Sequence, residues 1–232
     1  MNSAMWRDLG AKLTSAGSDP SVRCVILRGD GDAFCAGADI DELKSLVADP
    51  QLLSENNKLI RETQLTLEGL SKPTIACIRG ACVGGGTGLA MACDFRIAAE
   101  GAKFAITPAK LGLLYSEPDT RRLVNLVGLQ KAKEILFLAD LISAEQALAT
   151  GLISQIVPPA ELSTTVEALA ARLVAASASS IAGTKVMLGH IAGNHPQQSN
   201  TLHALFEAAF TSDDCREGIA AFLEKRPANF NP

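Results

Sequence analysis

The feature that most constrains this chain is the alternation of short apolar runs with amphipathic stretches over its first two thirds. Residues 22–27 and 74–78 are mostly apolar and rich in β-branched side chains, and each run gives way to glycine, which is typical of buried strands. Residues 52–70, between them, repeat apolar side chains with a helical period. Strands that alternate with helices pair mostly in parallel, with the helices outside. The sequence therefore predicts an α/β fold.

Further elements follow from the same pattern. Ser143 with Gln146 is typical of a capping box, which predicts a helix ending near Gly151. The remaining expected elements are helices at 3–16 (capped by Ser3), 39–47, 88–93, 123–127 and 131–138, and strands at 95–98 and 152–157. From Ala160 onward only helical periodicity is found, in three or four segments with a break at 193–196. We therefore divide the chain into a core, 1–159, and a helical C-terminal region, 160–232.

Charge and composition exclude several classes of partner. The formal net charge is −4, whereas binding to nucleic acid needs clustered Lys and Arg. No apolar run reaches the roughly 18 to 20 residues of a membrane span, and the N-terminus lacks a basic segment before an apolar stretch. None of the six cysteines forms a CxxC pair, so we expect reduced, buried thiols and no metal site. These observations predict a cytoplasmic protein without a membrane or nucleic-acid partner.

Two glycine-rich segments carry most of the functional information. Residues 34–40 form a turn of small residues, and residues 80–88 form a glycine loop that opens a helix. Glycines let a ligand approach the backbone, and the first amides of a helix are unpaired. One amide from each segment could therefore meet at a developing oxyanion. The alternative is that both segments are simple tight turns. A dinucleotide-binding fingerprint is disfavoured because position 89 is Leu, and a P-loop is excluded because no Gly-Lys-Ser/Thr follows.

Taken together, the segments FCAGADI (34–40) and KPTIACIRGACVGGG (72–86) resemble those of the crotonase (enoyl-CoA hydratase/isomerase) superfamily. The similarity continues through residues 104–113 and 142–153 and closes on 217–226. The resemblance implies a ClpP/crotonase spiral of stacked ββα units, with C-terminal helices that form a homotrimer or a dimer of trimers. It also implies an acyl-CoA thioester substrate. No separate cofactor is implied, because coenzyme A is part of the substrate.

The resemblance implies roles for individual residues. The backbone amides of Ala38 and Gly85 match the donors that bind the thioester carbonyl and stabilise its enolate. The stretch 36–40 would lie along the pantetheine and adenine, and two C-terminal positions match residues that contact CoA, sometimes from a neighbouring subunit. The positions implied to bind substrate are Ala36, Ala38, Asp39, Ile40, Gly85, Phe222 and Lys225.

The chain departs from the family pattern where hydratases carry two glutamates. Gly88 and Pro108 occupy those positions, and neither can transfer a proton. Two acids, Glu117 and Asp119, closely follow Tyr115 and would titrate usefully if desolvated. Tyr115, Glu117 and Asp119 are therefore catalytic candidates. The alternative for each acid is a solvated loop carboxylate, and the alternative for Tyr115 is a packing residue.

The reaction therefore stays open between three alternatives. The first is an enolate-stabilising enzyme of the hydratase/isomerase type. The second is a decarboxylase-like lyase, because residues 107–115 resemble the methylmalonyl-CoA decarboxylase branch, although that branch carries His where this chain has Ala38. The third is a non-catalytic acyl-CoA-binding subunit, a reading prompted by the lost glutamates and by the expectation that the family's N-terminal strands are missing.

Overall fold

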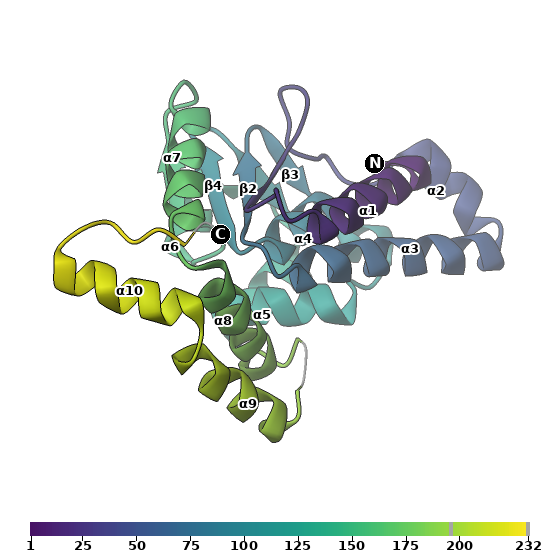
Figure 1. The fold of residues 1–232 in the computed structure, drawn as a ribbon. Coiled ribbons are helices and arrows are strands. Elements are labelled where there is room, and N and C mark those ends of the chain that lie inside the picture. Colours follow the sequence, from purple (N-terminus) through teal and green to yellow (C-terminus); the bar gives the residue numbers. More distant parts are fainter. Residues whose placement is uncertain (195–196, 231–232) are drawn as a thin grey trace.

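The computed structural model describes residues 1–194 and 197–230, and its centre is a parallel four-stranded sheet (Figure 1). Its strands lie in the order β1-β2-β4-β7, and every neighbouring pair is parallel. A second sheet has the order β3-β5-β6, with β3 and β5 parallel and β6 antiparallel to β5. The strand bounds are β1 Val25–Arg28, β2 Thr74–Ile78, β3 Ala81–Val83, β4 Phe95–Ala99, β5 Lys103–Ala105, β6 Ile142–Ser143 and β7 Gln155–Val157.

Strand β2 is buried along its whole length because helices cover both faces of the larger sheet. Ile75 and Cys77 face a cluster formed with α7, Leu162–Val174. The alternate residues Ala76 and Ile78 face the main core on the opposite side. This two-residue alternation into two apolar layers explains why the strand is a continuous apolar run.

The helices on the main-core side build the environment of the glycine loop. Helix α4, Gly85–Ala92, packs against α3, Pro50–Gly69, and against the long helix α5, Glu117–Leu138. Helix α1, Ser3–Ser18, lies along α3 (Figure 1). The other elements on this side are α2 Ile40–Val47, the 3-10 helix η1 Pro108–Leu111 and α6 Ala144–Ala149.

The predicted α/β class, the parallel pairing and most of the predicted elements are confirmed, with local corrections. Asn2, not Ser3, caps α1, because its Oδ1 accepts the Met5 amide at 3.0 Å. Strand β1 starts three residues later than expected, at Val25. The two helices predicted near 123–127 and 131–138 are parts of α5, and the break between them is the non-helical Gly128. Ser143 and Gln146 do form the predicted capping box.

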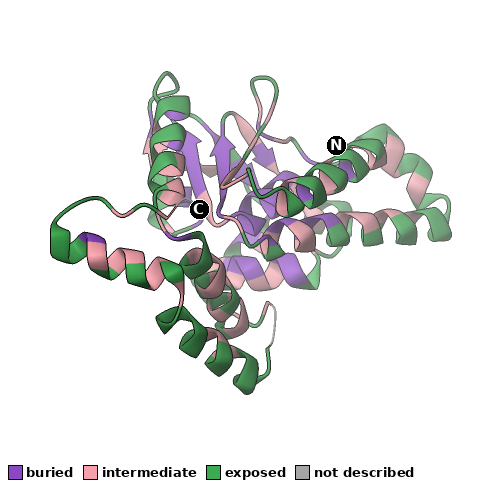
Figure 2. Cartoon of the chain, viewed as in Figure 1, coloured by how far each residue is buried: buried purple, intermediate pink, exposed green. Residues whose placement is uncertain are grey.

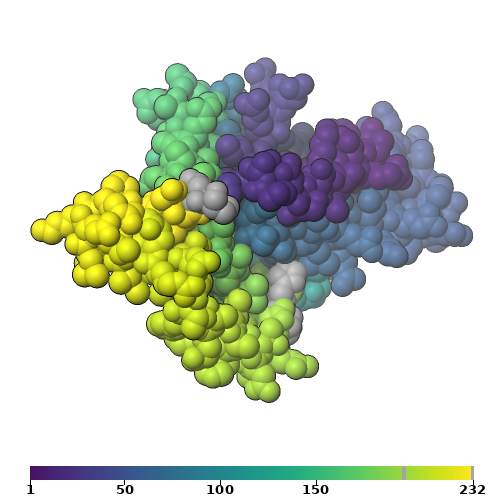
Figure 3. All heavy atoms as spheres, viewed as in Figure 1, coloured from purple at the N-terminus to yellow at the C-terminus, as the bar shows by residue number. Residues whose placement is uncertain are grey.

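Among the described residues four helices follow residue 160, where the sequence predicted three or four, and three of them extend away from the sheets. They are α7, α8 Ala178–Ile191, α9 Ser199–Phe210 and α10 Asp213–Glu224. The break predicted at 193–196 reaches His195 and Pro196, which lie outside the described residues. Helices α8 to α10 consist of intermediate and exposed residues, with Ala221 buried (Figure 2), and form a lobe beside the core (Figure 3). Apolar side chains such as Phe206, Phe210 and Phe222 are exposed on this lobe. Its role in oligomerisation stays a prediction.

Within the described residues, no single helix has the length and apolar character of a membrane span; the bent pair α7 and α8, at 101°, meets that test only when its two helices are joined. The six cysteines, all in the described part of the chain, are free. No cluster of His, Cys, Asp and Glu suited to a metal is found among the described residues.

Candidate active site

A cavity of about 670 Å³ brings the two glycine-rich segments together. Ala36, Ala38 and Ile40 line it from the first segment, and Gly84 and Gly85 line it from the second. Helix α3 and the stretch between η1 and α5 form much of the remaining wall, and Trp6, Leu43 and Asp119 add to it from α1, α2 and α5. The cavity therefore lies between the two glycine-rich segments and the helices that pack around them.

Backbone hydrogen bonds fix the first segment against the second. The Cys35 amide donates to the Ala81 carbonyl at 3.0 Å, and the Val83 amide donates back to the Cys35 carbonyl at 2.9 Å. Packing is tight here, because a Cβ on Gly86 would lie 2.3 Å from the Cys35 carbonyl oxygen. Glycine at position 86 thus lets helix α4 start directly against the segment that carries Ala38.

Helix α4 starts at the wall of the cavity, where Gly84 and Gly85 line it. Gly84 is the N-cap, with φ 56°, and it supplies no side-chain cap. Gly85 is the first residue of the helix, so its N–H has no acceptor four residues earlier within the helix. The helix dipole adds partial positive charge at this end. Ala38 and Gly85 therefore line one cavity at the end of a helix that favours negative charge.

Three polar side chains meet at the position where residue 88 would have a side chain. A Cβ on Gly88 would lie 2.4 Å from Gln64 Nε2, 2.9 Å from Asp119 Oδ1 and 3.2 Å from Tyr115 Oη. These residues come from α3, from the start of α5 and from the stretch before it, and all three line the cavity. The space next to Gly88 is therefore filled by an amide, a carboxyl group and a phenol.

Asp119 is held at this position by hydrogen bonds. Ser116 Oγ donates to Oδ2 at 2.7 Å and Arg122 Nη1 donates to Oδ1 at 3.0 Å. The Asp119 side chain is only 6% exposed. Burial raises the pKa of Asp119 above its ordinary value of 3.8, against the lowering effects of Ser116, Arg122 and Gln64. A carboxyl group with a raised pKa beside a cavity is suited to accept and return a proton.

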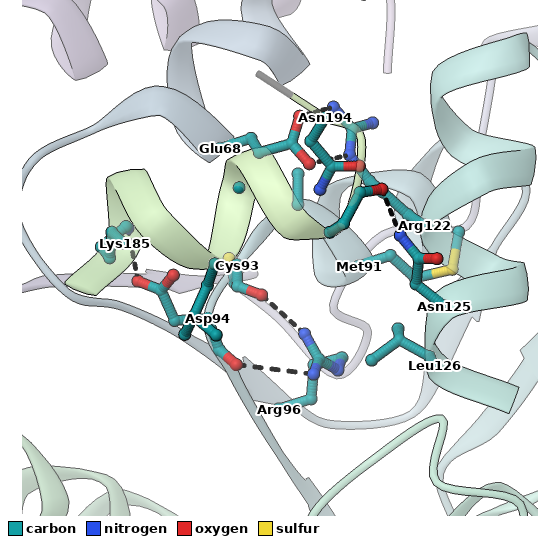
Figure 4. Close-up of a pocket in the computed structure, with 14 residues that line it drawn as sticks. Glu68, Met91, Cys93, Asp94, Arg96, Arg122, Asn125, Leu126, Lys185 and Asn194 are labelled. Carbon is teal, nitrogen blue, oxygen red and sulfur yellow. Dashed lines mark hydrogen bonds and ion pairs between the residues drawn. The ribbon is translucent and has the colours of Figure 1, made fainter. Parts of the chain in front are cut away.

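Arg122 links Asp119 to Glu68 on α3. Its Nε and Nη2 donate to the Glu68 carboxylate at 3.0 and 2.7 Å, and its side chain is 2% exposed. Burial would lower the pKa of Arg122, but its bonds to Glu68 and Asp119 outweigh this and raise it. The pair also borders a second cavity, of about 290 Å³, together with Asp94 and Lys185 (Figure 4). The Arg122 guanidinium thus connects Asp119, which lines the first cavity, to Glu68, which lines the second.

Tyr115 is positioned by a main-chain contact. Its hydroxyl donates to the Gly84 carbonyl at 3.2 Å. Burial raises the pKa of Tyr115 well above its ordinary value of 10.0, so the phenol stays protonated. Tyr115 therefore connects the glycine loop to the stretch that leads into α5.

Several predicted site residues lie elsewhere. Glu117 is the first residue of α5, but its side chain is 74% exposed and pairs with Arg121, so it lies outside the cavity. Asp39 caps α2 through the Glu42 amide and borders a small neighbouring pocket. Phe222 lies on α10 and Lys225 caps it, and within one chain they are away from α1 to α3 (Figure 1). A role for any of these in binding CoA stays a prediction.

The sequence interpretation missed Gln64 and Arg122. Both are polar side chains at positions that their helices bury, at 2% and 3% exposure. Gln64 lies four residues after Ile60 and three before Leu67, on the apolar stripe that predicted α3. A polar residue on such a stripe is the signal that would have identified it.

Parallel strands, short ββα units and a helical extension define this chain as a ClpP/crotonase-type fold. The crystal structure of an enoyl-CoA hydratase/isomerase family protein from Hyphomonas neptunium superposes with a TM-score of 0.94 at 38% identity, covering 100% of this chain and 88% of the other. The sequence model described as Enoyl-CoA hydratase/isomerase matches residues 1–232. The chain belongs to the enoyl-CoA hydratase/isomerase family.

Two curated relatives illustrate the range of the family. The crotonyl-CoA hydratase of Syntrophomonas wolfei is 39% identical over 225 residues, covering 94% of this chain and 84% of the relative. The mitochondrial Delta(3,5)-Delta(2,4)-dienoyl-CoA isomerase of Dictyostelium discoideum is 34% identical over 224 residues, covering 92% and 76%. This chain is thus similar both to a protein named as a hydratase and to one named as an isomerase.

Proposed function

We propose that this protein is an acyl-CoA-transforming enzyme that polarises a thioester in an oxyanion hole and moves a proton with Asp119. The amides of Ala38 and Gly85 would donate to the thioester oxygen and stabilise the enolate. Asp119 would then exchange a proton with the acyl chain or with water. The observation that carries the proposal is the approach of the Asp119 carboxyl group to the space left by Gly88.

Proton transfer of this kind needs a carboxyl group close to the acyl carbons. Family hydratases place one on the residue that corresponds to Gly88, and this chain places Asp119 Oδ1 2.9 Å from the Cβ position there. The lost glutamate is thus replaced in space by a residue from another helix. This supports hydratase or isomerase chemistry over a non-catalytic binding subunit.

A decarboxylase-like lyase is the less favoured reaction. Its sequence support is the match that ends at Tyr115, whose hydroxyl is occupied by the Gly84 carbonyl. The buried Asp119 would also repel the carboxylate of a malonyl-type substrate. Decarboxylation generates the enolate by loss of CO₂, so it needs no protein carboxyl group such as Asp119 beside the acyl carbons.

The assembly and location are part of the proposal. We propose a homotrimer or a dimer of trimers, because α8 to α10 expose large apolar side chains. Phe222 and Lys225 would then reach the CoA of a neighbouring subunit. The six free thiols fit the reducing cytoplasm.

The test is to supply crotonyl-CoA, 3-enoyl-CoA and methylmalonyl-CoA separately and to follow the conjugated thioester absorbance and CO₂ release. We expect turnover of an enoyl-CoA and no CO₂. Release of CO₂ would establish the lyase reaction instead. Binding of every ester without turnover would support the binding subunit, and failure to bind any of them would refute the proposal.

A further inference from the structure

Gln64 has a buried donor that the fold does not use. Its side chain is 2% exposed, and its Nε2 has no hydrogen-bond partner among the described residues. Native proteins rarely leave a buried polar atom unpaired, because the group lost its water on folding. Such an atom on a cavity wall is explained when a ligand supplies the missing acceptor.

The orientation of the amide follows from its neighbours. Nε2 is the atom that approaches the Gly88 Cβ position, at 2.4 Å, and Asp119 Oδ1 approaches the same point at 2.9 Å. An amide oxygen turned this way would be repelled by the carboxylate, whereas the N–H₂ end is attracted. Gln64 also acts on Asp119 as a weak donor, the last of the groups that lower its pKa, but this contact does not reach hydrogen-bond geometry. An N–H₂ group has two donors, so at least one of them is left for a ligand. A donor and a proton acceptor therefore face the same small volume.

We propose that Gln64 Nε2 binds an oxygen atom attached to, or about to attack, the β-carbon of the acyl group. This inference rests on the proposed function and narrows it to hydration. The ligand class is a water molecule beside a 2-enoyl-CoA, or the 3-hydroxyl group of the product. The N–H₂ group of Gln64 can only donate a hydrogen bond to this oxygen, so Asp119 alone transfers the proton.

The reaction balances with these two side chains. The water oxygen forms a bond to C3 while its proton moves to the Asp119 carboxylate. The C2=C3 electron pair shifts toward the thioester, whose oxygen carries the charge against the Ala38 and Gly85 amides. Asp119 returns the proton to C2, and the thioester carbonyl re-forms. The sum is the addition of one water molecule, with the carboxylate regenerated.

Gln64→Met tests the inference, because it keeps the length of the side chain and removes the donor. We expect the affinity for 3-hydroxybutyryl-CoA to fall roughly 10-fold and kcat for crotonyl-CoA to fall roughly 10- to 100-fold. The affinity for butyryl-CoA, which has no oxygen at C3, should stay within about twofold. Gln51→Met is the matched control, because Gln51 is an exposed glutamine on the same helix.

The outcomes test the role of Gln64 separately from the proposed enzymatic function. Equal weakening of both ligands, or an unchanged kcat, would overturn the role of Gln64 and indicate a structural amide that an ordered water satisfies. An inactive wild type would instead refute the proposed function. Thermal unfolding of Gln64→Met checks the fold. If that variant does not fold, Gln64→Leu replaces it: it also removes the donor and stays apolar, and the same selective loss is expected.

Discussion

The two sides of the cavity are built on different principles. On the glycine side, small residues of two segments line the cavity, and their positions depend on how closely the two segments approach. On the opposite side, Gln64, Tyr115 and Asp119 reach one point from different elements. A main-chain donor does not depend on the side chain of its residue, so it is lost only when the loop that carries it changes shape. A side chain can be supplied from a different helix instead, as Asp119 would be at Gly88 under the proposed function.

Asp119→Asn should give the largest effect, because it removes the proposed proton-transfer group and leaves the glycine side intact. We expect kcat for the preferred enoyl-CoA to fall by roughly 10² to 10⁴. Binding of a saturated acyl-CoA should be kept, as isothermal titration would show. Full activity in this variant would mean that only the glycine side matters.

Arg122→Met should mainly affect stability. It leaves the carboxylates of Glu68 and Asp119, which are 11% and 6% exposed, without their shared cation. We expect urea unfolding to show a loss of about 3 to 5 kcal/mol. The double variant Arg122→Met, Glu68→Gln should recover part of it. Lys12→Met, at an exposed pair, should change stability by about 0.5 kcal/mol or less.

Gly86→Ala tests the glycine side. The new Cβ would meet the Cys35 carbonyl oxygen and Cβ at 2.3 and 2.8 Å, so the segment that carries Ala38 must shift. Displacing one oxyanion donor costs roughly 10² to 10³ in rate. Steady-state kinetics would show this loss, whereas Gly31→Ala, with no atom within 4 Å of its new Cβ, should behave as the wild type.

The pH profile distinguishes the two sides, because only one of them titrates. As a base, Asp119 must be ionised, and burial raises its pKa above 3.8. Activity should therefore fall about tenfold per pH unit as the pH drops below that raised pKa. Profiles of kcat/KM would show an acidic limb that is absent from the residual activity of Asp119→Asn. The same limb in both proteins would assign it to another group.

Glu117→Gln should have the smallest effect. The side chain is 74% exposed and its partner is Arg121, so kcat should change by about twofold or less. A large loss would return Glu117 to the catalytic set and move the proton-transfer site toward the surface.

The parts of the site that follow from backbone were predictable from sequence. Small residues at 36–38 and glycines at 84–86 indicated that two main-chain segments would meet, and the structure places them on one cavity. The continuous apolar run at 74–78 likewise indicated a strand buried on both faces. Strands β3 and β5 were missed, since three residues carry too little periodic signal.

The choice between Glu117 and Asp119 could not be made from the sequence. The predicted helix began at 123, so neither acid had a helical face. Once α5 begins at Glu117, residues two apart point about 200° from each other, so one acid faces solvent and the other the cavity. Gln64 was missed because Tyr115 and Asp119, which it meets beside Gly88, lie more than 50 residues away along the chain.

Crowding around Gly88 has an evolutionary consequence. A glutamate there would place its Cβ 2.4 Å from Gln64 Nε2 and 2.9 Å from Asp119 Oδ1, so the ends of both side chains would have to move before it fits. A glutamate at position 88 and the present meeting of amide and acid therefore exclude each other. A mutation that brings a glutamate to this position would first disturb the group that now occupies the space, so the two arrangements compete for one volume.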